Sequence, residues 1–185
     1  LLRPGRKLHG VPEEYIVQGD ILDPKSLSEG MRGATQVIHL AAVADWESIQ
    51  NPNVWDSIVE GTRNILAAAR DCGVQRVLHV SSAAAINGTL QPRLLNENSP
   101  FTLPHSGFLY AHAKREAERI CEEFQRAGLP VVIVNPSETY DPEASSHSTT
   151  SNLHRLVKGQ ATYITRGGTG VVHAEDVATA ILAAL

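Results

Sequence analysis

The sequence has only two cysteines, and their positions argue against a disulfide and against a metal site. Cys72 and Cys121 lie far apart, each in a segment with helical character, and neither has the spacing of a metal ligand. Two isolated cysteines are more typical of free thiols in a reducing compartment than of a disulfide bond. We therefore expect two buried free thiols and no metal site.

Long hydrophobic runs and clustered positive charge are also missing. No apolar segment approaches the roughly 20 residues of a membrane-spanning helix, and no signal peptide is recognisable. The net charge is −4, and the one short basic stretch is Arg3, Arg6 and Lys7. Because nucleic-acid surfaces carry a basic stripe, we expect no nucleic-acid partner. From the missing apolar segment and signal peptide we expect no membrane partner and a cytoplasmic location.

The two ends of the chain lack ordinary boundaries. The sequence begins at Leu1 without an initiator methionine, its one methionine is Met31, and it stops inside the helical pattern of residues 181–185. Its length and its hydrophobic content of 42% suit one domain with a substantial core. We expect residues 1–185 to be a partial domain, incomplete at both ends.

Short apolar runs alternate with helical patterns along the chain. Strands are predicted at residues 15–20, 36–42, 76–82, 131–135 and 161–165. Helices are predicted at residues 23–31, at 52–72, from Tyr110 to about 127, and at 174–185, with polar segments at 87–107 and 141–152. This order is typical of an α/β fold with a parallel sheet covered on both faces.

Small or polar residues follow four of these predicted strands. They are Asp20, Ala41 with Ala42, Ser81 with Ser82, and Asn135 with Pro136. The carboxyl ends of parallel strands meet at one edge of the sheet, where ligands bind in such folds. We expect the functional site there.

Tyr110 and Lys114 are the strongest chemical signal in the sequence. Four positions apart on a helix, they share one face. A neighbouring ammonium favours the phenolate, so we expect the pKa of Tyr110 to be lowered and the phenol to exchange a proton with a substrate oxygen. Ser82 would donate a hydrogen bond to the same oxygen.

Six further segments occur in an order that resembles the extended short-chain dehydrogenase/reductase superfamily, in particular its NAD-dependent epimerase/dehydratase family. They are residues 19–23, 39–42, 61–64 with 73–76, Glu97 with Ser99 and Pro100, 135–137, and 172–178. The resemblance covers essentially the whole chain. It implies a Rossmann-like doubly wound parallel sheet, NAD or NADP as cofactor, and a small-molecule substrate, and it leaves a homodimer open.

The resemblance also assigns residues to roles. The catalytic residues are Ser82 as substrate-oxygen donor, Tyr110 as general acid/base and Lys114 as its electrostatic partner. Cofactor contacts are expected from Arg3, Asp20, Ile21, Leu40, Ala41, Ala42, Ser81, Tyr110, Lys114, Pro136 and Ser137. Substrate contacts are expected from Ser82 and Asn135.

Three features depart from the family pattern. The glycine-rich turn that cradles a pyrophosphate is absent, and residues 167–170, although rich in glycine, are interpreted as a loop. The substrate-binding C-terminal segment is absent as well. Ile58 stands where many members have an asparagine. We therefore expect residues 1–185 alone to bind a dinucleotide weakly or not at all.

The sequence allows two interpretations for some of these residues. Asp20 either contacts adenine or forms a turn at a strand end, and Arg3 either grips a 2′-phosphate or is a solvated arginine. Ser82 is preferred over Ser81 as the substrate donor. His39 and His79 are expected to be buried and hydrogen-bonded.

Three functions fit these residues. The first is hydride transfer at a carbinol or carbonyl carbon of a nucleotide sugar or related compound. The second is an NADPH-dependent ketone or aldehyde reductase of the dihydroflavonol and cinnamoyl reductase type, which the spacing from Ser82 to Gly88 favours. The third is a non-catalytic protein that senses NAD(P).

Overall fold

A three-stranded parallel sheet forms the centre of the protein. The structure is a computed structural model that describes residues 1–6, 8, 10–43, 51, 53–141, 156–160 and 167–185. The sheet has the order β1 (Gln36–His39), β2 (Arg76–Val80) and β3 (Val131–Val134). Its register aligns Ile38 with Leu78 and Leu78 with Val132, so the three strands end together at one edge. These strands confirm the parallel α/β arrangement predicted from the sequence.

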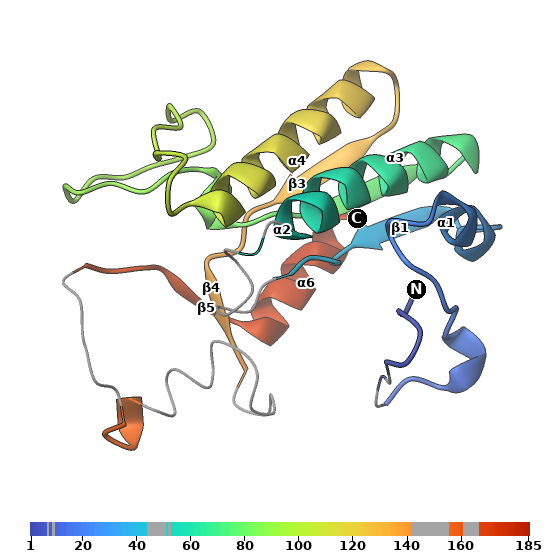
Figure 1. The fold of residues 1–185 in the computed structure, drawn as a ribbon, viewed down its shortest axis with the longest axis horizontal. Coiled ribbons are helices and arrows are strands. Elements are labelled where there is room, and N and C mark those ends of the chain that lie inside the picture. The colour runs from blue at the N-terminus through green and yellow to red at the C-terminus, as the bar shows by residue number, and fades with distance from the viewer. Residues whose placement is uncertain (7, 9, 44–50, 52, 142–155, 161–166) are drawn as a thin grey trace.

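Helices lie on both sides of this sheet (Figure 1). α3 (Gly61–Asp71) and α4 (Leu109–Arg126) lie side by side over one face, and α6 (Ala174–Ala184) lies on the other side. Each connection between neighbouring strands passes through a helix, as parallel pairing requires. The architecture is the Rossmann-like, doubly wound fold that we expected.

The helix predicted at residues 52–72 contains a π-helical segment. It consists of α2 (Asn53–Trp55), the π segment η2 (Asp56–Glu60) and α3, and it is followed by Gly73 at a φ of 72°. The Thr62 hydroxyl donates to the Ile58 carbonyl at 2.6 Å within this region. The same carbonyl also accepts from the Gly61 N–H, so the threonine uses its second lone pair.

The prediction of a buried strand at residues 15–20 is wrong. Glu13–Tyr15 form a 3-10 turn, η1, and in the described part of the chain Gln18 makes one isolated bridge, to Leu2. Tyr15 is 75% exposed and Val17 is 43% exposed. An apolar run gains little as a strand when it has no ladder on either side, so these residues cross the surface instead.

Several elements outside the central sheet are short. α1 (Pro24–Gly30) begins at Asp23, whose side chain accepts from the Lys25 N–H as expected of an N-cap. A second, unpredicted parallel sheet pairs β4 (Glu138–Tyr140) with β5 (Val171–His173). Residues 167–170 precede β5 without helical structure, which confirms their interpretation as a loop. The strand predicted at 161–165 and most of the polar segment at 141–152 lie outside the described residues.

The core lies between the sheet and the two helices above it. Leu66, Val77 and Ile120 are fully buried there, and Ile58 is among the buried residues of the same cluster. Cys72 is half-buried, Cys121 is buried, and both are free thiols. Within the described ranges, none of the helices combines the length and the apolar character needed to cross a membrane.

Candidate active site

The chain beyond β2 and the chain beyond β3 stay hydrogen-bonded after the strands end. The Ser81 N–H donates to the Val134 carbonyl and the Ala83 N–H donates to the Pro136 carbonyl, both at 2.8 Å. Ser82 lies between these bonds in extended backbone and caps the 3-10 turn η3 (Ala83–Ala85), its hydroxyl oxygen accepting from the Ala84 N–H at 3.2 Å. The position of Ser82 is therefore held from both sides.

α4 brings Tyr110 and Lys114 to this strand end. The Ser82 side chain lies near enough to the Tyr110 phenol to lower the pKa of that phenol. Lys114, 3% exposed, donates from Nζ to the Val80 carbonyl at 3.0 Å, and its Nζ lies 5.9 Å from the centroid of the Tyr110 ring. The phenol, the ammonium and the hydroxyl that the sequence singled out thus gather at the carboxyl end of β2.

The expected lowering of the Tyr110 pKa is wrong for this state of the protein. Burial raises the pKa of the phenol above its usual value of 10, and the nearby Ser82 side chain opposes that rise. The Lys114 ammonium is directed at the Val80 carbonyl, and burial lowers its own pKa to about 8, while Glu118 and Cys121 oppose that fall. Burial therefore sets the direction of both pKa shifts, in place of the attraction that the helical spacing suggested.

Ser81 and Ser82 point to different partners. The Ser81 hydroxyl is buried and donates to Glu118 Oε1 at 2.5 Å. The Asn135 side-chain amide donates to the same Glu118 oxygen at 2.5 Å and to the Ser82 carbonyl at 3.1 Å. Glu118 takes the Ser81 hydroxyl proton, which leaves that oxygen only its acceptor lone pairs. The expected cofactor contact of Ser81 stays a prediction, as does substrate binding by Asn135.

Glu118 is the polar residue of this site that our sequence analysis missed. It lies four residues after Lys114 on the buried face of α4, among Ala113, Ala117 and Cys121. A carboxylate in such an apolar stripe is costly to bury without partners. A glutamate in an apolar stripe of the sequence could therefore have indicated a buried polar network.

Asp20 and Ile21 are engaged within the protein. One carboxylate oxygen of Asp20 accepts from the Leu22 N–H at 2.9 Å, which is the geometry of the turn alternative. Ile21 packs against Gly61, where an added Cβ would lie 2.6 Å from the Ile21 Cδ1 atom. Their expected contacts with adenine stay predictions.

The other expected cofactor residues divide between the surface and a cavity. Leu40 is 63% exposed and Ala41 is exposed, whereas Ala42 packs against the core. Pro136 and Ser137 line a cavity of about 310 Å³ between the end of β3, β5 and α6. Their contacts with a cofactor stay predictions.

Arg3 is exposed near the Leu2–Gln18 bridge. A hollow of about 460 Å³ in this region is lined by Arg6 and not by Arg3. The alternative of a solvated arginine therefore agrees with the geometry, and a role in binding a 2′-phosphate stays a prediction.

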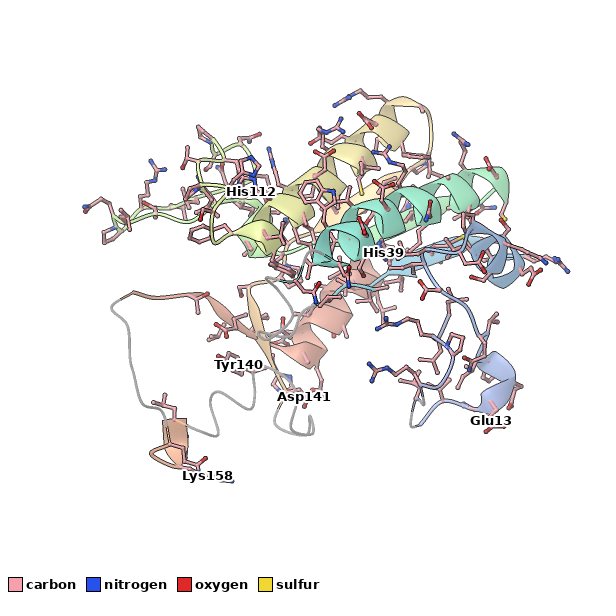
Figure 2. All side chains as sticks on the ribbon, in the orientation of Figure 1. Glu13, His39, His112, Tyr140, Asp141 and Lys158 are labelled. Carbon is pink, nitrogen blue, oxygen red and sulfur yellow. The ribbon has the colours of Figure 1, made fainter. Side chains whose placement is uncertain are left out.

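His39 and His79 form a buried pair below the helices (His39 is labelled in Figure 2). Their ring centroids lie 4.9 Å apart, and His39 Nε2 is 3.0 Å from the Thr62 hydroxyl. Among the described residues, neither ring nitrogen of His79 has a hydrogen-bond partner, so the expectation of two satisfied histidines is wrong for His79. Burial, with Lys114 nearby, lowers the pKa of His39 to about 3 and that of His79 well below 6.5.

His112 ties the loop formed by the predicted polar segment, residues 87–107, to the start of α4. It lies between Tyr110 and Lys114 in sequence, and Figure 2 shows it where the helix meets that loop. Its ring stacks on His105 with centroids 3.9 Å apart, and its Nε2 lies 3.0 Å from the Leu103 carbonyl oxygen. The loop is therefore fixed next to the tyrosine.

Comparisons with known proteins agree with the fold. The family model described as the NAD dependent epimerase/dehydratase family matches residues 2–185. Cinnamoyl-CoA reductase 1 of Oryza sativa subsp. japonica is 29% identical over 184 residues, which cover 94% of this chain and 53% of that protein. A putative dihydroflavonol 4-reductase of Synechocystis is 29% identical over 178 residues, 96% of this chain and 51% of that one.

The fold is shared with a dehydratase of known structure. A double mutant of DesIV, a dTDP-glucose 4,6-dehydratase from Streptomyces venezuelae solved with NAD and DAU bound, has a TM-score of 0.75 and 29% identity. The match covers 88% of this chain and 52% of the dehydratase. The chain thus spans about half the length of the curated relatives that it matches.

Proposed function

The chain belongs to the NAD dependent epimerase/dehydratase family, and we propose that it transfers hydride between a nicotinamide cofactor, NAD or NADP, and a carbon that changes between alcohol and ketone. The observation that carries this proposal is the meeting of Tyr110, Ser82 and Lys114 at the end of β2. A bound nicotinamide supplies the group that accepts or gives the hydride. The protein supplies the proton and the orientation of the substrate oxygen.

The donors at this site fit a cofactor ribose. Lys114 carries three N–H donors, and in the part of the chain that the structure describes the Val80 carbonyl accepts one of them. The remaining donors can hold ribose hydroxyls. The effect of Ser82 on the Tyr110 pKa supports an arrangement in which one substrate oxygen binds both hydroxyls.

The proton and electron balance follows from these positions. In oxidation, the carbinol C–H bond would break with its electron pair leaving as hydride to a bound nicotinamide, and the substrate O–H proton would pass to Tyr110 in its phenolate form, which burial disfavours. In reduction, a bound reduced nicotinamide would supply hydride to the carbonyl carbon, and the Tyr110 phenol would give its proton to the carbonyl oxygen. A nucleotide sugar is our first candidate substrate, supported by the similarity to the dTDP-glucose dehydratase.

Net reduction of a ketone or aldehyde is the second candidate. Burial keeps the Tyr110 phenol protonated at neutral pH, which suits proton donation to a carbonyl oxygen. Similarity to the cinnamoyl-CoA and dihydroflavonol reductases supports the same direction. A cytoplasmic location and a homodimer are part of the proposal and stay predictions.

The test compares two assays of the full-length protein. A panel of ketones and aldehydes is offered with NADPH or NADH, and absorbance at the nicotinamide band reports net oxidation of the cofactor. UDP- and dTDP-sugars are offered in parallel, and chromatography reports products formed without net cofactor change. Turnover in either assay supports the proposal, and tight NAD(P) binding with no turnover in both would support a non-catalytic sensor instead.

A further inference from the structure

The Glu118 carboxylate joins three elements at the candidate active site. It is 6% exposed and lies on α4, one helical turn after Lys114. One of its oxygens accepts from Ser81 and from Asn135, each at 2.5 Å. The other accepts from Arg115 Nη1 at 3.3 Å. Both oxygens of this buried charge are therefore hydrogen-bonded.

We propose that Glu118 is a positioning residue that fixes Ser82 and Lys114 in the arrangement that proton transfer requires. This inference rests on the proposed hydride-transfer function, because it assigns Glu118 a task in the same site. In this role Glu118 contacts neither the Tyr110 phenol nor the substrate. It acts through Asn135 and Ser81 on one side and through its charge on the other.

The connection to Ser82 runs through the two strand ends. Asn135 donates from one nitrogen to Glu118 and to the Ser82 carbonyl, at 2.5 and 3.1 Å. Ser81, the residue before Ser82, is held by the same carboxylate oxygen. The main chain of Ser82 is thus fixed on both sides by α4, the helix that carries Tyr110. Glu118 therefore links the helix that carries Tyr110 to the strand end that carries Ser82.

The connection to Lys114 is electrostatic. Lys114 faces Tyr110, Glu118 and Cys121 on α4, His39 on β1, and His79 on β2. Both histidines are neutral at pH 7, because burial lowers their pKa. The negative charge of Glu118 counters the desolvation that otherwise lowers the pKa of Lys114. It therefore keeps more of the lysine protonated at neutral pH.

The test uses Glu118→Gln in the full-length protein, with Glu122→Gln as the matched control. Glu122 lies on the same helix, is exposed, and pairs with Arg126 at 3.1 Å. We expect Glu118→Gln to lower kcat about tenfold to a hundredfold, since small misplacements of reacting groups have effects of that size. We also expect the alkaline limb of the pH profile to move to lower pH. The control should keep the wild-type kcat and profile.

Two further measurements separate the possible causes. Asn135→Ala leaves the Glu118 charge in place and cuts the link to Ser82, so we expect a lower kcat with an unmoved alkaline limb. Hydrogen exchange of the Ser81 and Ala83 amides, which bond across the strand ends, should accelerate at least about tenfold in Glu118→Gln and not in the control.

Each failure has its own signature. Wild-type protein that turns over neither substrate class refutes the proposed function. Active wild type together with a Glu118→Gln variant of unchanged kcat, pH profile and exchange refutes the positioning role. Should Glu118→Gln fail to fold, wild-type kcat in Asn135→Ala refutes the role equally.

Discussion

The Nζ of Lys114 lies 3.0 Å from the carbonyl oxygen of Val80, so a buried ammonium ties α4 to the last residue of β2. A charged donor to a main-chain carbonyl is a strong hydrogen bond, and this one sits beside the Tyr110 ring. The lysine therefore has a structural task at the strand end as well as its proposed task toward the cofactor.

Tyr110→Phe should abolish most turnover. Loss of the phenolic hydroxyl removes the proton donor, and general acid/base groups contribute roughly a hundredfold or more. Steady-state kinetics on the substrate found in the assays above gives the measurement. Tyr15→Phe is the matched control, because Tyr15 is 75% exposed and remote from the site in sequence. Equal kcat in wild type and Tyr110→Phe would contradict the assigned role.

Ser82→Ala should lower kcat without unfolding the protein. The substitution removes the hydroxyl that reaches Tyr110 and the cap on η3, and an N-cap of this kind contributes about 1 kcal/mol. Ser28→Ala is the control, since its hydroxyl donates to the Pro24 carbonyl on the exposed side of α1. A Ser82→Ala variant with full activity would show that the phenol orients the substrate oxygen without this residue.

Lys114→Met should change how stability depends on pH. The folded pKa of Lys114 is about 8, below its value in the unfolded chain, so between these values the unfolded state binds more protons and stability rises with pH. The rise is about 3 kcal/mol across the window from about pH 8 to about pH 10.5. Urea unfolding at successive pH values should show this rise in wild type and lack it in Lys114→Met. Parallel curves for the two proteins would contradict the burial of a charged lysine.

His79→Leu should stabilise the protein in acid. The folded pKa of His79 lies well below 6.5, so wild-type stability is present above pH 6.5 and is lost as pH falls below it, when the unfolded state binds the proton. A leucine has no such proton and no unsatisfied ring nitrogen. Acid-unfolding curves should show a lower midpoint for His79→Leu, and an unchanged midpoint would count against the buried, neutral ring.

Gly61→Ala should destabilise the packing of Ile21 on α3. The new Cβ would lie 2.6 Å from the Ile21 Cδ1 atom, and overpacking of this type costs about 1–3 kcal/mol. The double variant with Ile21→Ala removes the clash, so the two changes should be non-additive. Thermal unfolding of the four proteins of this cycle gives the coupling. Additive changes would show that Ile21 moves aside without cost.

Much of the local structure could be predicted because its causes are local. The apolar periodicity of residues 109–126 and the glycine that follows them define α4, and Asp23 before Pro24 starts α1. The strands β1, β2 and β3 appear as short apolar runs. Residues 15–20 have the same pattern, yet they lack a neighbouring ladder in the described part of the chain. The pattern alone could not reveal that difference.

The sequence by itself determined that Tyr110 and Lys114 share a helical face and that two serines follow β2. The tertiary structure decided which serine reaches the phenol, where the ammonium points, and that Glu118 binds Ser81 and Asn135. It also decided the direction of the Tyr110 pKa, since desolvation depends on every element packed around the ring. Spacing along a chain fixes which side chains are neighbours on one helix. Only packing fixes which polar atoms lose water and which partners replace it.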